Sequence, residues 1–290
     1  MTMLEKPGEK AAAFNERELQ IVMVARMIEG GRTYWVTGGG TPLYATLLGK
    51  RLYAPEAQYI TEDGVIAPEP MLPFEPVMTM VASRPSYRAL AWGTMNTAGN
   101  HAQLGYMDYG IINALQIDSH GNINSTAIGT YGERMRRFGG PGGADTIAAC
   151  CWRTIIMTDQ EKRKFVGRCD FISSPGFLDG TPNARERAGL PRNTGPWRVV
   201  TPWAMYDYDD ERRLRLIAVA PFVTVDEVLE ACEHKPQVAD QVDTLDVPTE
   251  EELDVLRSQL DVQGQTTGIG RSGWVVREGD SYVRQADETS

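Results

Sequence analysis

The sequence predicts an α/β fold, because short apolar segments, glycine turns and helical segments alternate along the chain. Residues 34–36 are typical of a strand, a glycine turn follows, and residues 42 to about 50 have helical character. The apolar stretch 110–117, followed by a turn at 118–122, continues this alternation. Such a pattern is typical of sheets whose strands are connected by helices. A chain of 290 residues is long enough for one large or two modest domains with a full core.

The first third of the chain contains two predicted helices and two predicted strands. Residues 1–14 are expected to be a flexible lead-in. Asn15 and Glu18 have the spacing of a capping box, and apolar residues follow at helical spacing until two glycines at 30–31. Thr41 as N-cap, with proline next, predicts the second helix. A strand over 57–60 then stops at the sequence Thr-Glu-Asp-Gly.

Later segments follow the same rules. Residues 154–157 and 214–219 predict buried strands, Thr224 or Asp226 caps a short helix, and Thr249 opens a last amphipathic helix over 249–259. From about residue 263 the composition turns to Gly, Ser, Thr and charge, which predicts a tail. Because aromatic residues lie inside it, we expect this tail to pack on something, with a partner chain as one option. The expected organisation is a lead-in over 1–14, one domain over 15–262 and a tail over 263–290.

The composition excludes several classes of protein. The 29 basic and 39 acidic side chains give a formal net charge of −10, which disfavours nucleic-acid binding and attraction to anionic membranes. Apolar runs are too short for a membrane span, and the acidic N-terminal region lacks the pattern of a secretory signal. The four cysteines are therefore expected to be free thiols in the cytoplasm. With three scattered histidines and no CxxC, we expect no metal site.

Two glycine-rich loops are candidates for binding. Gly38, Gly39 and Gly40 lie between a strand and a helix, where backbone amides can bind an anion, although a simple tight turn is the favoured explanation. The second loop contains Gly139, Gly140, Gly142 and Gly143 around one proline. Its N–H groups suit a developing oxyanion, and a mobile surface loop is the alternative interpretation.

Two kinds of charged residue are candidates for chemistry. Glu62 follows a predicted strand, at the position where sites form in open α/β sheets, and its carboxylate is a candidate nucleophile or base. A solvated acid beside an Asp-Gly turn is the simpler explanation. Arg134, Arg136 and Arg137 precede the second glycine loop and are candidates for binding a carboxylate or phosphates, against the alternative of a solvated basic face.

Several stretches, in order, resemble the β subunit of family I CoA-transferases of the glutaconate CoA-transferase type. The resemblance covers about residues 15–262. The matching stretches are Arg51-Leu52-Tyr53-Ala54-Pro55, Ile60-Thr61-Glu62-Asp63-Gly64, Gln116-Ile117-Asp118, Gly121-Asn122-Ile123-Asn124-Ser125-Thr126, Arg137-Phe138 with the glycine loop, Glu161-Lys162-Arg163-Lys164-Phe165 and Ser173-Ser174-Pro175-Gly176-Phe177-Leu178-Asp179-Gly180.

The resemblance implies a fold, a reaction and roles for residues. The fold is a single large open sheet of the NagB/RpiA-like type with helices on both faces. Glu62 falls on the family's nucleophilic glutamate, which carries CoA as a glutamyl thioester between an acyl-CoA donor and an acceptor acid, with a dicarboxylic acid favoured. Gly142 falls on the oxyanion donor, and the other loop glycines with Arg137 on the surface that binds CoA or substrate. Asp63 departs from the family, where Ser or Asn is frequent, and a second carboxylate there is expected to influence Glu62 or substrate choice.

The resemblance also implies partners and alternatives. A homologous α subunit is expected to complete the active site in a heterodimer that assembles further. Coenzyme A is expected as a co-substrate, with no tightly bound cofactor. Some relatives lack the glutamate and are hydrolases or decarboxylases of CoA thioesters, so these activities are the enzymatic alternatives. A subunit that senses a ligand without catalysis is the other alternative, and it leaves Glu62 without a role.

Overall fold

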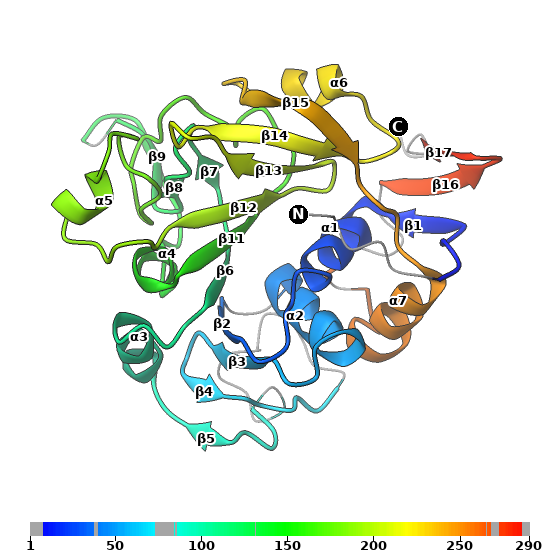
Figure 1. The fold of residues 1–290 in the computed structure, drawn as a ribbon, viewed down its shortest axis with the longest axis horizontal. Helices are drawn as coiled ribbons and strands as arrows, with labels where there is room; N and C mark the ends of the chain where they lie inside the picture. Colours follow the sequence, from blue (N-terminus) through cyan, green and yellow to red (C-terminus); the bar gives the residue numbers. More distant parts are fainter. Residues whose placement is uncertain are drawn as a thin grey trace.

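The computed structural model describes residues 8–37, 40–72, 84, 86–130, 132–264, 266–267 and 273–285. Within them, a ten-stranded sheet forms the centre of the molecule, in the order β15-β14-β13-β12-β11-β6-β2-β3-β4-β5 (Figure 1). The strands are β2 (Thr33–Val36), β3 (Gln58–Thr61), β4 (Val65–Ile66), β5 (Ala91–Trp92), β6 (Tyr109–Asn113), β11 (Arg153–Met157), β12 (Pro196–Val200), β13 (Ala204–Tyr208), β14 (Leu214–Val219) and β15 (Gln237–Thr244).

The central strands are parallel, and the chain changes direction across the sheet between β2 and β6. β2 pairs in parallel with β3 on one side and with β6 on the other, and β6 pairs in parallel with β11. Crossovers between parallel strands are right-handed, so connections that run in opposite directions place their helices on opposite faces. The helix between β2 and β3 therefore covers one face, and the helix between β6 and β11 covers the other.

The helices confirm the expected two-sided arrangement. In Figure 1, α1, α2 and α7 lie together, and α3 and α4 lie apart from them against the other side of the central strands. The helices are α1 (Glu16–Ala25), α2 (Gly40–Leu52), α3 (Met95–Gln103), α4 (Ala144–Cys150), α5 (Ala184–Arg187), α6 (Val225–Glu230) and α7 (Glu250–Val255), which continues into a π-helical turn at Leu256–Leu260.

Three helix starts follow the predicted caps, but the N-cap predicted at Thr41 is wrong, because α2 begins at Gly40 and Thr41 lies within its first turn. One helix end also differs from the prediction. Asn15 with Glu18 and Thr249 with Glu252 form complete capping boxes, and Thr224 rather than Asp226 caps α6. α1 ends at Ala25, before the predicted glycines, because the following turn tightens: the N–H of Met27 donates to the carbonyl of Val24. No helix among the described residues is long and apolar enough to cross a membrane.

The ends of the chain pair with each other. β1 (Ala13–Asn15), β16 (Trp274–Glu278) and β17 (Ser281–Arg284) form a separate antiparallel sheet. Phe14 is fully buried and its ring lies 5.7 Å from that of Tyr282. Residues 13–14, which belong to the expected lead-in, pair with β16, and the expected division of the chain stays a prediction. The tail packs on its own chain at β1, and a contact between the tail and a partner stays a prediction.

A buried ion pair connects α1 to α7. Arg26 and Glu252 are 4% and 1% exposed, and the guanidinium donates two hydrogen bonds of 2.7 Å to the carboxylate. Arg26 also donates to the carbonyls of Asp246 and Val247, while the carboxylate accepts from the Thr249 N–H. Burial alone would raise the pKa of Glu252, but Arg26, Tyr53 and the Thr249 N–H together lower it below its ordinary value.

We predict that Glu252→Gln destabilises the protein by about 3 kcal/mol, because it leaves the buried Arg26 charge with only the more exposed Asp246, 3.6 Å away, as its counterion. Urea unfolding at pH 7 measures the change, and Glu251→Gln, an exposed position one residue earlier, serves as the control with a change of about 0.5 kcal/mol or less. Because the folded pKa of Glu252 is depressed, the advantage of the wild type is present above the unfolded pKa and is lost as pH falls through the folded one. Equal unfolding curves for both variants at pH 7 would contradict this account.

Candidate active site

The site is built where β3 ends. Glu62 follows β3 directly and is 9% exposed. Its Oε1 accepts a hydrogen bond of 2.9 Å from the N–H of Gly143, the N-cap of α4. The strand end of β3 and the second glycine loop, which are about eighty residues apart in sequence, therefore meet at one carboxylate.

Gly64 allows the turn behind Glu62. Its φ is +93°, a conformation that L side chains rarely adopt. A Cβ on Gly64 would lie only 2.0 Å from the carbonyl oxygen of Thr94, and the N–H of Gly93 donates to the Gly64 carbonyl at 3.1 Å. Glycine is therefore needed at the end of the Glu-Asp-Gly sequence, because the chain turns back here against the segment before α3 and leaves no room for a side chain.

Asp63 is part of the same turn. Its carboxylate bonds to the hydroxyl of Thr61, and that hydroxyl accepts a 3.1 Å hydrogen bond from the N–H of Val65. The residue that departs from the family pattern therefore closes the turn at the end of β3. The expected influence of Asp63 on Glu62 or on substrate choice stays a prediction.

The second glycine loop lies against the glutamate through two of its glycines. A Cβ on Gly142, whose φ is +55°, would lie 2.5 Å from Oε1 of Glu62. A Cβ on Gly143 would lie 3.3 Å from Cγ of Glu62 and 3.5 Å from the ring of Trp35. For Gly139 and Gly140, an added Cβ would have no neighbour within 4 Å among the described residues, so these two glycines face open space there.

Other predicted site residues are placed differently. Gly40 begins α2 with a φ of +67°, and Gly38 and Gly39 lie outside the described residues. Arg137 is exposed and belongs to β10 (Met135–Arg137), which pairs with β9 (Ala127–Gly129) just before the glycine loop. Arg137 therefore lies on β10, whereas the contacts with Glu62 come from Gly142 and Gly143 of the loop.

Two buried asparagines on the segment that precedes this loop were not predicted to have a role. Asn122 accepts hydrogen bonds from the N–H groups of Gly176 and Leu178, and its amide donates to Asp118. The buried Asn124 accepts from the N–H groups of Thr126 and Ala127. Both asparagines belong to a stretch that matches the family. Their position beside a predicted turn could have indicated this role, because asparagine side chains often bond to nearby backbone groups.

Arg185 was also missed, because nothing in its local sequence marks it. It is 5% exposed and donates to the carbonyls of Ala148 and Ala149 in α4 and of Pro175 and Gly176. Burial lowers the pKa of Arg185 to about 10. A cation at the C-terminal end of α4 stabilises the helix whose N-cap contacts Glu62.

The remaining nucleophile and ligand candidates have structural roles. Burial raises the pKa of the Cys151 thiol, which disfavours the thiolate. His120 contacts the carbonyl of Arg212 through Nδ1 at 2.9 Å. Across the described ranges, no three His, Cys, Asp or Glu side chains gather in a way that would hold a metal ion.

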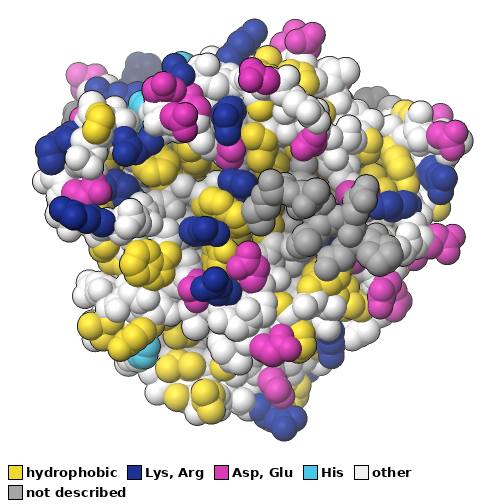
Figure 2. Space-filling model, viewed as in Figure 1, with side chains coloured by type: hydrophobic (Ala, Val, Ile, Leu, Met, Phe, Trp, Pro, Cys, Tyr) yellow, Lys and Arg dark blue, Asp and Glu magenta, His cyan; other side chains and the backbone are white. Residues whose placement is uncertain are grey.

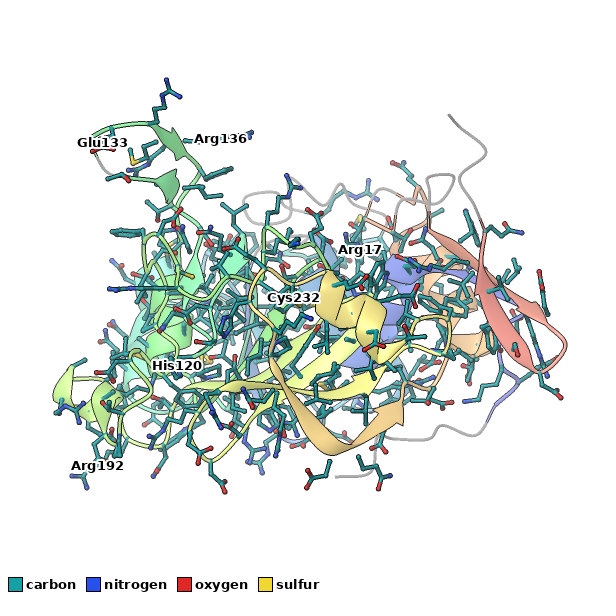
Figure 3. The ribbon with its side chains drawn as sticks, turned by 90° about the horizontal axis from the view of Figure 1, so that it is seen from above. Arg17, His120, Glu133, Arg136, Arg192 and Cys232 are labelled. Atoms are coloured by element: carbon teal, nitrogen blue, oxygen red, sulfur yellow. The ribbon has the colours of Figure 1, made fainter. Side chains whose placement is uncertain are left out.

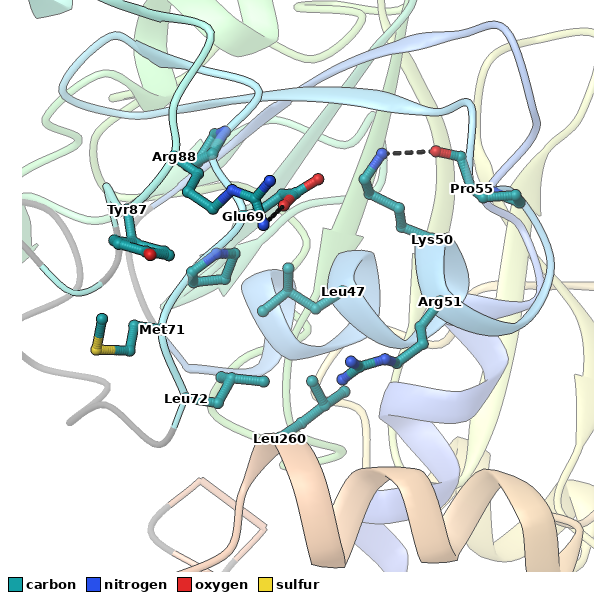
Figure 4. A pocket seen from close by; sticks show the side chains of 12 residues that line it. Leu47, Lys50, Arg51, Pro55, Glu69, Met71, Leu72, Tyr87, Arg88 and Leu260 are labelled. Carbon is teal, nitrogen blue, oxygen red and sulfur yellow. Dashed lines mark hydrogen bonds and ion pairs between the residues drawn. The ribbon is translucent and has the colours of Figure 1, made fainter.

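A cavity of about 550 Å³ lies elsewhere, at the C-terminal end of α2 (Figure 4). Its lining includes Lys50, Arg51 and Arg88, together with Glu69 and apolar side chains such as Leu47. Neither Glu62 nor a glycine of the second loop lines it. Leu47, the first residue of α2 in this lining, follows Gly40 by seven residues, a rise of about 10 Å along the helix.

Comparison with known proteins identifies the family. Residues 18–231 match the family described as Coenzyme A transferase. The chain is 33% identical over 258 residues to the B subunit of glutaconate CoA-transferase from Acidaminococcus fermentans, and the match covers 86% of this chain and 93% of that one. It is 30% identical over 257 residues to the B subunit of 3-oxoadipate CoA-transferase from Pseudomonas knackmussii, covering 85% and 94%.

A solved structure agrees with this result. The crystal structure of glutaconate coenzyme A-transferase from Acidaminococcus fermentans superposes with a TM-score of 0.79 at 30% identity, over 88% of this chain and 97% of that one. The chain belongs to the coenzyme A transferase family, and both the predicted resemblance and the predicted fold class are confirmed.

We predict that Gly142→Ala lowers kcat about 100-fold with a smaller change in KM. The added Cβ must displace the Glu62 carboxylate, and displacements near 1 Å can cost that much in rate. Gly189→Ala is the matched control, because Gly189 also has a positive φ, of +80°, but its Cβ would meet nothing within 4 Å among the described residues. Steady-state kinetics of the folded variants decide. A Gly142→Ala variant that matches Gly189→Ala would show that the loop tolerates a side chain there.

Proposed function

We propose that the protein is the β subunit of a CoA-transferase that moves CoA from an acyl-CoA donor to a carboxylic acid through a glutamyl-CoA thioester on Glu62. The observation that carries this proposal is the carboxylate of Glu62 held at a strand end by the N–H of Gly143. A carboxylate fixed against backbone donors, in a family named for CoA transfer, suits covalent catalysis.

The reaction divides into balanced steps. The Glu62 carboxylate attacks the thioester carbonyl of the donor, and the C–S bond breaks to give a mixed anhydride and CoA thiolate. The thiolate attacks the glutamyl carbonyl, which forms the enzyme thioester and releases the first acid as its carboxylate. The carboxylate of the second acid then attacks this thioester, and the two steps run in reverse. Each tetrahedral intermediate places negative charge on an oxygen, which backbone donors stabilise.

The glycine loop is suited to supply these donors. Gly142 and Gly143 approach Glu62 closely, and we assign the oxyanion contact to the N–H of Gly142, since the N–H of Gly143 already donates to Glu62. Loss of one such donor costs about 10²–10³ in rate. Gly139, Gly140, Gly40 and Arg137 remain proposed contacts for CoA or substrate, and no tightly bound cofactor is needed.

Hydrolysis or decarboxylation of a CoA thioester, and ligand sensing without catalysis, are less favoured. Two relatives at 30% identity or more are subunits of CoA-transferases, and Glu62 supplies the nucleophile that transfer through a covalent intermediate requires. A dicarboxylic acid substrate is supported by the names glutaconate and 3-oxoadipate of these relatives. We also propose a cytoplasmic location, which the free cysteines support.

The α-type partner is expected to cover one exposed apolar surface. Around β5 and α3, Leu90 and Trp92 are 80% and 67% exposed, with Leu104 and Tyr106 nearby in sequence. Figure 2 shows apolar side chains gathered in this region, at the lower left. The surface is continuous with the catalytic turn, because Gly93 bonds to Gly64. Exposed clusters of this kind mark interaction sites, so this one supports an α subunit docked beside Glu62.

We predict that Trp92→Asp weakens association with the co-expressed α-type subunit by at least about 30-fold, the effect of a hot-spot residue worth about 2 kcal/mol. Val238→Asp is the control, since Val238 is also exposed but lies on β15 at the other edge of the sheet. Co-purification and a titration of the two subunits measure the effect. Equal affinity of the two variants would place the partner elsewhere.

The nucleophile is tested by Glu62→Gln, which keeps the shape and removes the carboxylate. Transfer should fall to background while acyl-CoA still binds. Wild-type enzyme incubated with acyl-CoA and borohydride should be reduced at residue 62, because borohydride attacks the thioester, and peptide mass spectrometry locates the change. Glu62→Gln treated in the same way is the control and should stay unmodified. A modification at another residue, or normal transfer by the variant, would overturn the mechanism.

A further inference from the structure

A two-stranded arm stands out from the body of the molecule. The arm consists of β9, β10 and the turn between them, of which residue 131 lies outside the described residues. In Figure 3 it projects away from the rest of the ribbon and carries Glu133 and Arg136. Its two strands pair only with each other within the described residues. Since an isolated hairpin has little stability in water, an arm of this kind needs support at its base.

The base of the arm is firmly held. The side-chain oxygen of Asn124 accepts from the N–H groups of Thr126 and Ala127 at 2.9 and 3.2 Å, and its amide donates to the Gln116 side chain at 2.6 Å. The N–H of Gly129 donates to the carboxylate of Asp170 at 2.8 Å. The arm therefore has a defined direction relative to the sheet.

The arm carries cations without counterions. Arg134, Arg136 and Arg137 are exposed, and no carboxylate of the described residues lies within 4.0 Å of their guanidinium groups. Arg136 lies over the ring of Phe138 at 5.2 Å, which orients it. The whole chain has a net charge of −10, so this basic arm is a local exception.

The arm leads directly into the glycine loop. The N–H of Phe138 donates to the Thr126 carbonyl at 2.8 Å and that of Gly140 to the Ser125 carbonyl at 3.0 Å, so the start of the loop and the arm share one base. Gly142 follows Arg136 by about six residues, a span of about 20 Å at most. A ligand that reacts at Glu62 and also contacts the arm must bridge this span, with its reactive group at one end and anionic groups at the other.

Coenzyme A has this construction. Its thiol is separated by the long pantetheine chain from a diphosphate and a 3′-phosphate. We propose that the arginines of this arm bind the phosphate groups of CoA while its thioester reacts at Glu62. The inference rests on the proposed function and extends it to the part of the substrate that does not react.

Charge and side-chain direction favour this ligand. Arg136 and Arg137 are consecutive in β10, so their side chains leave opposite faces of the ribbon, and two separate phosphate groups can be held by an arm with a cation on each face. Arginine matches phosphate oxygens with two parallel donors. An acidic protein would otherwise repel a polyanionic substrate, and a local basic element removes this barrier.

The test compares two substrates with the assembled two-subunit enzyme. Acyl-CoA carries the phosphates, whereas the matching acyl-pantetheine has the same thioester without them. Arg136→Gln should lower kcat/KM for acyl-CoA about ten-fold, and the triple change of Arg134, Arg136 and Arg137 to Gln at least about 100-fold, as expected for lost charge-assisted bonds. The value for acyl-pantetheine should stay within about two-fold of wild type.

The control is Arg192→Gln, an exposed arginine at a distance from the arm in Figure 3. It should leave both substrates unchanged. The KM of the wild type for acyl-CoA should rise with salt, and that of the triple variant should rise less. A parallel titration measures binding of free CoA, which should weaken in the arm variants.

The outcomes separate the inference from the proposed function. Equal losses with both substrates would show that the arm only positions the glycine loop, and no loss with either would show that it does not contact CoA. Dissociation of the subunits by the triple change would make the arm a protein contact. Each of these results overturns the inference. If the wild type binds CoA through the arm but transfers none, the inference stands and the proposed function is wrong.

Discussion

The site depends on two positions that leave no room for a side chain, one in the turn behind Glu62 and one beside its carboxylate. On one side Gly64 leaves so little space that a Cβ would lie 2.0 Å from the carbonyl oxygen of Thr94. On the other side, a Cβ added to Gly142 would lie 2.5 Å from the Glu62 carboxylate. Because no side chain occupies either position, the glutamate can be fixed by backbone groups, which need no rearrangement when charge develops on the substrate.

The fold places these two positions through its topology. β3 and β6 flank β2, so the ends of all three strands lie at the same edge of the sheet. The chain leaves β6 through the Asn122 and Asn124 network and returns at α4, whose N-cap donates to Glu62. Arg185 holds the other end of α4 through its carbonyls. Residues far from Glu62 in sequence therefore fix the direction from which Gly143 approaches.

Local patterns in the sequence were sufficient for some elements of the fold. Capping boxes at Asn15 and Thr249 depend on contacts three residues apart, and they formed as predicted. The position of Glu62 at a strand end followed from the apolar run that precedes it. Pairing between β1 and β16 could not be predicted, because it joins residues about 260 apart and neither strand has a strong pattern of its own. The N–H of Gly143 as the donor to Glu62 was hidden for the same reason.

The stretches that resemble the family divide into two physical groups. Glu62 and the glycines at 142 and 143 meet at the reacting carboxylate. Asn122 and Asn124 instead satisfy buried backbone groups, and an unsatisfied buried donor or acceptor costs about 1–3 kcal/mol. A motif is therefore not by itself evidence of contact with substrate. Residues of the second group act on the reaction only by fixing where the loop and the arm lie, so their replacement should disturb structure and rate together.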